Sequence, residues 1–414
     1  MDYPLKSMTI ADRVTFHSVI DSRFKTNRIS VCFIVPMQEK NVTVHALLPQ
    51  VLKKGFKDCP SFTELSRRLE NLYGAYVEAD EQKRGDYQIL SLSITGIDDR
   101  FALKQEPITE KLAEILCGLI WNPLLENDGF SEKYVELEKH ALIDYIEAEI
   151  NEKRSYAIGQ LIRTMCAGEP YGIPSYGFKE KVKEITPQSA KQAYDSLLES
   201  AQIEILFTGC GSADRALAVF RSALEGQKRS RQDLIPITPH PALEKDVQEK
   251  TEQMSVSQSK LVLGFSCGIS GSDPEIPAVR MMAAILGGTT SSKLFVNVRE
   301  KLSLCYYCIS RYDLYKGILL IDSGVENINI EKARAEILAQ LEAICKGDFT
   351  EEEQRSALLS LKNSYNSVYE SDSSIEGYYF GQILKKTRFT PEMEKEKLEK
   401  VTREEIIQVA KKIK

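Results

Sequence analysis

The stretch FTEEEQRSALLSLKNSYNSVYE, from Phe349 to Glu370, repeats the pattern of FSEKYVELEKHALIDYIEAE, from Phe130 to Glu149. Each copy starts with Phe and a hydroxyl residue, continues with acidic side chains, and then shows the apolar spacing of a helix. A hydroxyl residue followed by carboxylates is typical of a helix N-terminus. Because one copy lies in each half of the chain, the pattern predicts a tandem duplication of one domain.

The segments around both copies predict a domain of the α+β class. In the first half, strands are expected over 13–20, 28–37, 75–82, 87–96 and 203–210, and helices over 44–56, 61–74, 108–125, 131–153 and 189–200. In the second half, strands are expected over 260–269, 305–315 and 317–325, and helices over 275–288, 291–303 and 330–347.

The stretch between the two halves is polar, charged and contains prolines, which is typical of a linker. We therefore expect an N-terminal domain over 1–225, an interdomain linker over 226–256 and a C-terminal domain over 257–414. Two homologous domains on a flexible linker suggest a clam-shell with a chamber between them. Clefts between domains are where ligands usually bind.

The composition excludes several classes of protein. The 414 residues carry 54 Lys and Arg against 60 Asp and Glu, a net charge of -6, so no basic excess attracts nucleic acid. No run approaches the roughly 18 to 20 apolar residues of a membrane span, and the N-terminus lacks the apolar core of a signal peptide. Nine cysteines, scattered singly, favour free buried thiols in a reducing compartment. We expect a cytoplasmic protein with neither nucleic acid nor membrane as a partner.

The stretch LGGTTSSKLFVNVREKLSLCYY, from Leu286 to Tyr307, contains a glycine pair and a C-x-x-C. A phosphate loop needs G-x-x-x-x-G-K-[ST] directly after a strand, whereas a predicted helix precedes these glycines, which favours a helix cap. Cys305 and Cys308 lack the two further ligands of a structural zinc site. On a regular strand, moreover, their side chains would point to opposite faces.

The four histidines, His17, His45, His140 and His240, lie in different segments and none is spaced from another at i, i+3 or i+4. No Gly-x-Ser-x-Gly nucleophile elbow and no Cys/His pair is evident. A hydrogen-bonded or solvated structural role is favoured for each histidine. The residues alone therefore indicate no self-sufficient catalytic centre.

Several short motifs together resemble one family over essentially the whole chain. They are FKTNRISV near the start, LENLYGA at 69–75, NEKRSYA at 151–157, EPYGIPSYG at 169–177 and the stretch at 286–307. On these residues the sequence resembles the pitrilysin and mitochondrial-processing-peptidase superfamily of inverzincin metallopeptidases, and within it the zinc-less bacterial members of the YmfF type. The resemblance implies two tandem LuxS/peptidase-like sandwich domains, each an antiparallel-type sheet with helices packed on one side.

The resemblance also locates a degenerate metal motif. Members that cleave peptides carry H-x-x-E-H on an early helix, with two histidines for zinc and a glutamate as general base. The match places the histidine positions on Ala46 and Gln50, the base on Pro49, and the third ligand, a glutamate in active members, on Tyr145. His45 lies one residue early, about 100° from the required helix face. Because catalytic zinc takes three protein ligands, we expect no metal and no cofactor on this chain.

A second element of the family is retained. In active members, the resemblance implies, a second-half arginine and a tyrosine seven residues later hold the backbone of the scissile peptide. Here they correspond to Arg299 and Tyr306. A guanidinium and a phenol are two donors that suit a carbonyl oxygen on which negative charge develops. An arginine at a helix end followed by a strand tyrosine is, by itself, also a common surface pattern.

Together these features favour a non-catalytic subunit of a heterodimeric zinc peptidase that degrades or processes peptides. A paralogue with intact H-x-x-E-H would supply the zinc and the base, and this chain would contribute Arg299 and Tyr306 to substrate binding. The alternative is a non-enzymatic scaffold or peptide-binding protein that keeps the fold for assembly only. A homodimer is also open.

Overall fold

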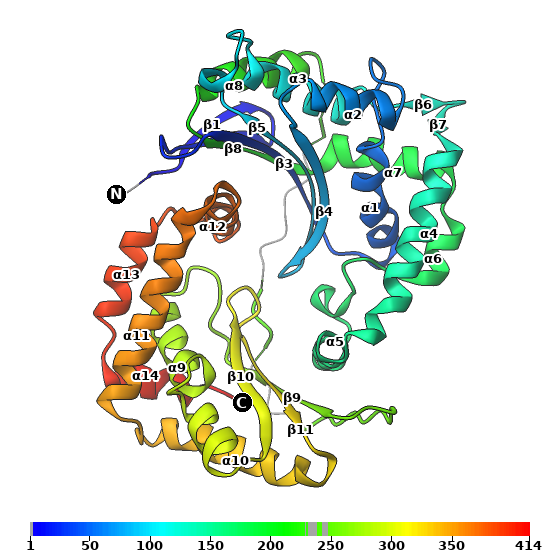
Figure 1. The fold of residues 1–414 in the computed structure, drawn as a ribbon. Coiled ribbons are helices and arrows are strands. Elements are labelled where there is room, and N and C mark those ends of the chain that lie inside the picture. The colour runs from blue at the N-terminus through cyan, green and yellow to red at the C-terminus, as the bar shows by residue number, and fades with distance from the viewer. Residues whose placement is uncertain (1–2, 228, 231–237, 242–246) are drawn as a thin grey trace.

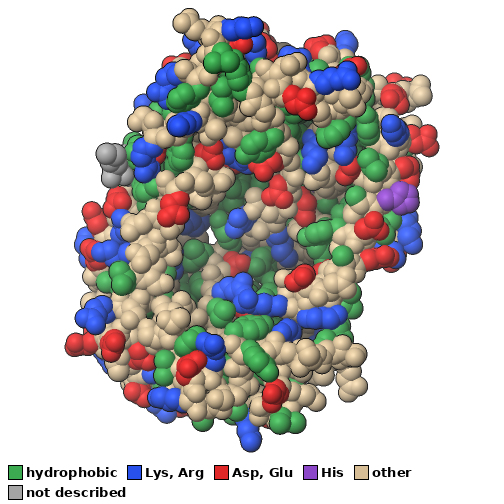
Figure 2. All heavy atoms as spheres, in the orientation of Figure 1, with side chains coloured by type: hydrophobic (Ala, Val, Ile, Leu, Met, Phe, Trp, Pro, Cys, Tyr) green, Lys and Arg blue, Asp and Glu red, His purple; other side chains and the backbone are tan. Residues whose placement is uncertain are grey.

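The computed structural model describes residues 3–227, 229–230, 238–241 and 247–414. Each half of the chain forms a lobe, and the two lobes face each other in the clam-shell arrangement that the sequence suggests (Figure 1). The space-filling view is hollowed where the lobes meet (Figure 2). The fold class is α+β, as expected.

The first lobe is built on a six-stranded sheet with the order β1-β2-β8-β3-β5-β4. Its strands are β1 (Lys6–Ala11), β2 (Val14–Ile20), β3 (Thr26–Pro36), β4 (Tyr76–Arg84), β5 (Tyr87–Ile97) and β8 (Gln202–Gly209). Neighbouring strands are antiparallel except for β2 and β8, which are parallel. The sheet is therefore mixed, with one parallel pair inside an antiparallel framework.

Helices of the same lobe cover the outer face of this sheet. They are α1 (Glu39–Leu52), α2 (Phe62–Glu70), α3 (Ile108–Trp121), α4 (Glu132–Ala148), α6 (Lys179–Glu184), α7 (Pro187–Ser200) and α8 (Ala213–Leu224). Alternate residues of β3, Ile29, Val31 and Phe33, point into this core, as strand periodicity requires. Ser61 caps α2 by accepting a hydrogen bond from the Glu64 backbone N–H, at 3.2 Å. A short hairpin of β6 (Leu125–Glu126) and β7 (Gly129–Phe130) precedes α4.

The second lobe has a smaller sheet. Among the described residues it contains three antiparallel strands in the order β10 (Cys305–Asp313), β11 (Ile318–Val325) and β9 (Ser259–Ser266). Its helices are α9 (Ile276–Gly287), the π-helix η4 (Leu294–Lys301), α10 (Ile330–Cys345), α11 (Glu351–Asn366), α12 (Asp372–Leu384), α13 (Pro391–Glu399) and α14 (Arg403–Ala410). Side chains from β11, such as Leu319 and Ile321, pack against several of these helices in one core.

The two lobes exchange a helix. In the first lobe, α4 leads through a 3₁₀ turn (Glu149–Asn151) into α5 (Lys153–Met165), which packs on the sheet of the second lobe. In the second lobe, α11 leads through a 3₁₀ turn (Ser367–Glu370) into α12, which packs on the sheet of the first lobe (Figure 1). The duplicated pattern in the sequence therefore corresponds to a duplicated crossing between the lobes.

This crossing corrects one prediction. The sequence predicts a single helix from Ser131 to about Lys153, but α4 ends at Ala148 and α5 begins at Lys153. The break redirects the chain so that Ile162 and Met165 of α5 pack near Ile318 and Leu320 of the other lobe. Burial of these apolar side chains against another sheet outweighs continuation of the helix.

The described part of residues 226–256 contains no helix or strand. The nine cysteines all lie within the described ranges, and each is a free thiol. None of the helices described here is long and apolar enough to cross a membrane.

Candidate functional site

The positions that correspond to the metal motif lie on α1 and α4 and carry no zinc-binding set. Ala46 and Pro49 are buried in the α1 interior. The amide of Gln50 donates to the backbone oxygen of Ala79 on the edge strand β4, at 2.9 Å. Tyr145 on α4 is 61% exposed and lies edge-on against Tyr176, with ring centres 5.5 Å apart. Zinc in proteins is held by His, Cys, Asp or Glu, so these four residues do not fit a zinc ion.

His45, one residue before this motif, cannot replace a ligand. Its side chain is buried and its Nδ1 atom has no hydrogen-bond partner among the described residues. Burial lowers the pKa of His45 to about 4, because an imidazolium would lose its hydration there. His45 is therefore a neutral core residue, which agrees with the structural role that the sequence favours.

A buried carboxylate near these positions was not singled out from the sequence. Glu81 on β4 accepts a hydrogen bond from the Ser175 hydroxyl at 3.2 Å, while its second carboxylate oxygen is buried and has no partner in the described part of the chain. Burial raises the pKa of Glu81 to about 7, and neighbouring Asp80 adds to the rise. One carboxylate, however, cannot provide the three ligands of a catalytic zinc site.

The glycine pair at 287–288 is explained by packing. Gly288 is the C-cap of α9, and a Cβ atom on Gly287 would lie 2.6 Å from the backbone nitrogen of Ser310 on β10. The pair thus ends a helix and lets α9 approach the sheet closely. This agrees with a helix cap rather than a phosphate loop.

Arg299 lies on the π-helix η4, which packs against β10. Its guanidinium carbon is 4.5 Å from the centre of the Phe295 ring, one turn earlier, and Nη1 lies 3.3 Å from Oε1 of Glu300. The side chain remains 39% exposed. Such a stacked and partly exposed arginine is held in place yet available to a ligand.

Tyr306 lies at a β-bulge in β10. Cys305 is opposite Val325 and Tyr307 is opposite Gly324, so Tyr306 has no partner residue in the ladder. Its side chain is 64% exposed. Bulges commonly turn a side chain away from its regular direction, often beside functional sites.

The same bulge corrects the prediction for the two cysteines. On a regular strand Cys305 and Cys308 would point to opposite faces, but the extra residue places both in the buried core of the second lobe. A hydrogen bond between the thiols lowers the pKa of Cys305 and raises that of Cys308.

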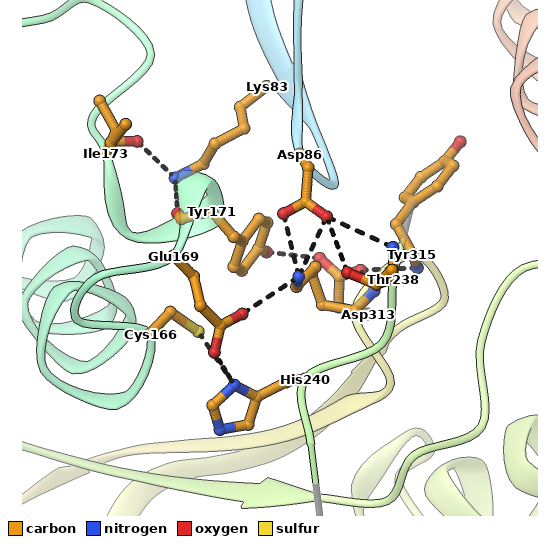
Figure 3. A network of polar contacts seen from close by, with 11 residues as sticks. Lys83, Asp86, Cys166, Glu169, Tyr171, Ile173, Thr238, His240, Asp313 and Tyr315 are labelled. Carbon is orange, nitrogen blue, oxygen red and sulfur yellow. Dashed lines mark hydrogen bonds and ion pairs between the residues drawn. The ribbon is translucent and has the colours of Figure 1, made fainter. Parts of the chain in front are cut away.

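A polar network between the lobes was missed from the sequence (Figure 3). Lys316, 1% exposed and in the turn after β10, lies 2.9 Å from Asp86 in the β4–β5 turn and 3.2 Å from Glu169. The second oxygen of Glu169 is 2.6 Å from Nδ1 of His240. Cys166 Sγ lies 3.9 Å from the same nitrogen. A Cys/His pair therefore exists in space, but its members are 74 residues apart in the sequence and no motif marks it.

Comparisons with known proteins agree with this architecture. The sequence profile of the family described as "Peptidase M16 inactive domain" matches residues 184–361. A Bacillus subtilis protein named "Probable inactive metalloprotease YmfF" is 30% identical over 402 residues, which cover 97% of this chain and 93% of that protein. The chain belongs to the peptidase M16 family. Within this family it is similar to an inactive member, in agreement with its missing zinc ligands.

Solved structures extend the likeness to the fold of the whole chain. A conserved protein from Enterococcus faecalis V583 superposes with a TM-score of 0.90 at 26% identity, covering 99% of this chain and 96% of that chain. A protease from Helicobacter pylori superposes with a TM-score of 0.80 over 100% of this chain and 97% of that chain. Because the Helicobacter pylori protease is only 17% identical in sequence, this superposition shows a shared fold and nothing about a shared activity.

Proposed function

We propose that this chain is the subunit of a heterodimeric M16 peptidase that lacks the catalytic zinc. In this proposal a paralogue with H-x-x-E-H supplies zinc and the general base, and the present chain supplies Arg299 and Tyr306 to the backbone of a bound peptide. Membership of the M16 family and the lack of zinc ligands at Ala46, Gln50 and Tyr145 support a dependent role.

The observation that carries the proposal is the position of Tyr306. The bulge leaves Tyr306 64% exposed, whereas the hydroxyl of its neighbour Tyr307 is buried and has no hydrogen-bond partner among the residues that the structure describes. Arg299 lies on the helix that packs against this strand. Both side chains are donors, and two fixed donors can stabilise the negative charge that develops on a peptide carbonyl oxygen during hydrolysis.

The test is co-expression of this chain with an M16 paralogue that carries H-x-x-E-H, followed by purification and cleavage of a fluorogenic peptide library. We expect a stable heterodimer that cleaves peptides, while this chain alone does not. In the heterodimer, Arg299→Ala and Tyr306→Phe should each lower kcat by about 100-fold, the usual cost of losing one donor to an oxyanion.

Two matched variants serve as controls. Tyr307→Phe removes a phenol hydroxyl from the next residue, where no described residue bonds to it. Lys301→Ala removes an exposed cation from the same π-helix. Both should leave kcat unchanged. If the heterodimer forms but Arg299→Ala and Tyr306→Phe are as active as the controls, the chain acts as a scaffold. If no zinc-bearing paralogue binds, the pairing itself is wrong.

A further inference from the structure

Three side chains of different chemistry converge between the lobes, and none of them belongs to the degenerate metal motif. Cys166 follows α5, Glu169 lies three residues later, and His240 belongs to the stretch that connects the lobes. One ligand atom from each, Sγ, a carboxylate oxygen and an imidazole nitrogen, lies within 4.8 Å of the other two. Thiolate, imidazole and carboxylate are the three ligand types that zinc takes from proteins.

The geometry does not suit a nucleophilic triad. In such a triad the nucleophile contacts one imidazole nitrogen and the orienting carboxylate contacts the other. Here Cys166 Sγ and Glu169 Oε1 both face Nδ1 of His240, at 3.9 and 2.6 Å (Figure 3). Ligand atoms of three zinc-binding types that lie within 4.8 Å of one another can instead surround a single cation when the hydrogen bond between Glu169 and His240 opens to admit it.

The backbone around these donors is held in place by hydrogen bonds. The N–H of Glu169 donates to the carbonyl oxygen of Cys166 at 3.0 Å, closing a tight turn in which Gly168 has a φ of 82°. The N–H of His240 donates to the carbonyl oxygen of Lys316 at 2.7 Å. The His240 carbonyl oxygen accepts from the Ser266 hydroxyl at 3.1 Å. Such a backbone fixes ligand positions before any ion binds.

A neighbouring residue orients Glu169. Nζ of Lys316 lies 3.2 Å from Oε2 of Glu169, which leaves Oε1 on the side of His240. In metal sites, groups that hold the second oxygen of a carboxylate or the second nitrogen of a histidine set the direction of the ligand atom. Lys316 has this role here, and its own charge is also paired with Asp86.

The charge of the surrounding network favours one added positive charge. Two carboxylates, those of Asp86 and Glu169, contact one ammonium group, that of Lys316, so the formal charge of this network is minus one. A zinc ion that displaces the thiol proton of Cys166 into solvent adds one net positive charge. The network would then be neutral, which is the less costly state for partly buried charges.

A cavity adjoins two of the three residues. Its volume is about 680 Å³, and its lining includes Cys166 and Glu169.

We propose that Cys166, Glu169 and His240 bind one zinc ion, with water in the fourth position, and that this ion fastens residues 238–241 to the turn that contains Cys166 and Glu169. The role is structural and separate from peptide cleavage. The proposal is independent of the heterodimer proposed above, because every ligand belongs to this chain and the readout is metal binding.

The test uses the purified full-length chain, stripped with a chelator and titrated with Zn²⁺ or Co²⁺. We expect one equivalent of either ion, and the Co²⁺ form should show the near-ultraviolet charge-transfer absorption of a thiolate–cobalt bond. Cys166→Ser should abolish that absorption. Glu169→Gln and His240→Ala should each weaken the affinity for Zn²⁺ by at least about 100-fold, since even changes outside the ligand set cost 10- to 100-fold.

Matched controls separate this site from other thiols, imidazoles and carboxylates of the chain. Cys345→Ser, His140→Ala and Glu147→Gln should keep one equivalent of metal and unchanged affinity. A wild-type chain that binds neither ion overturns the proposal, and this outcome does not depend on how well any variant folds. Equal metal binding by Cys166→Ser or loss of metal from Glu147→Gln would also overturn it, the latter by placing the ion at the degenerate motif.

Discussion

Nζ of Lys316 lies 2.9 Å from Oδ1 of Asp86, and the two residues belong to β-turns of different lobes. Lys316 is almost completely buried, and its partner is largely buried as well. A buried ion pair contributes little net stability compared with an apolar pair, but the loss of one partner leaves an uncompensated charge in the interior. The stability of the contact between the lobes should therefore be sensitive to a single substitution at Lys316 or Asp86.

Lys316→Met should destabilise the chain by about 3–5 kcal/mol, because it leaves the carboxylates of Asp86 and Glu169 without their common cation. Urea denaturation followed by circular dichroism measures the change. Lys346→Met is the matched control, because its partner Glu342 is exposed, and it should cost less than about 0.5 kcal/mol. Equal losses of stability in the two variants would show that the Lys316 contacts do not stabilise the contact between the lobes.

The exchanged helix α12 gives a second prediction. Phe380 is buried among Cys32, Ile34, Ile89 and Leu206 of the other lobe. Phe380→Ala should cost about 3–5 kcal/mol, the usual result of removing a phenyl ring from a packed core. Leu359→Ala on α11, where the side chain is 60% exposed, should change stability by less than about 0.5 kcal/mol. A small effect of Phe380→Ala would mean that α12 does not hold the lobes together.

The exchange of helices also marks the limit of what the sequence predicts. The apolar run of β3 predicts a strand, and both faces of that strand are buried. Ile29 and Val31 face helices close by in the chain, whereas Ser30 and Arg28 contact Glu376, more than 340 residues away. Periodicity identifies a buried face, but it does not say which distant helix covers that face.

The site residues show a similar limit. Arg299 and Tyr306 were located by resemblance, since an Arg and a Tyr seven residues apart carry no signal of their own. The bulge at Tyr306 was not predicted, because no glycine or other irregular residue in CYYC marks it. The contact between the two lobes brings Cys166, Glu169 and His240 together. No local pattern in the sequence could therefore predict their cluster.

The glycine pair after α9 allows a direct test of the packing explanation. Gly287→Ala should destabilise the chain by about 1–3 kcal/mol, because its Cβ atom would lie 2.6 Å from the Ser310 backbone. Gly377→Ala, in the middle of α12 with open space around its Cβ position, should stabilise by about 0.5–1 kcal/mol. Thermal denaturation measures both. A tolerated Gly287→Ala would leave the glycine unexplained by contact with β10.

Glu81 predicts a dependence of stability on pH. Its pKa is raised to about 7 by burial, from a value near 4.5 in the unfolded chain, so the folded protein binds a proton more tightly. Stability contributed by the protonated carboxyl is present below pH 4.5 and is lost as the pH rises to about 7. Glu81→Gln should therefore stabilise the chain by about 1–3 kcal/mol at pH 8, with little effect at pH 4.5.

Denaturation of both proteins across pH 4.5 to 8 measures this difference. Glu114→Gln, at an exposed position in the middle of α3, is the control and should change stability by less than about 0.5 kcal/mol throughout. A stabilisation by Glu81→Gln that is the same at both ends of the pH range would contradict the prediction, because the removal of a titrating carboxylate must act only where that carboxylate is charged. A destabilisation at pH 8 would instead mean that the charged Glu81 has a stabilising partner, such as Lys83, whose charge lowers the pKa of Glu81.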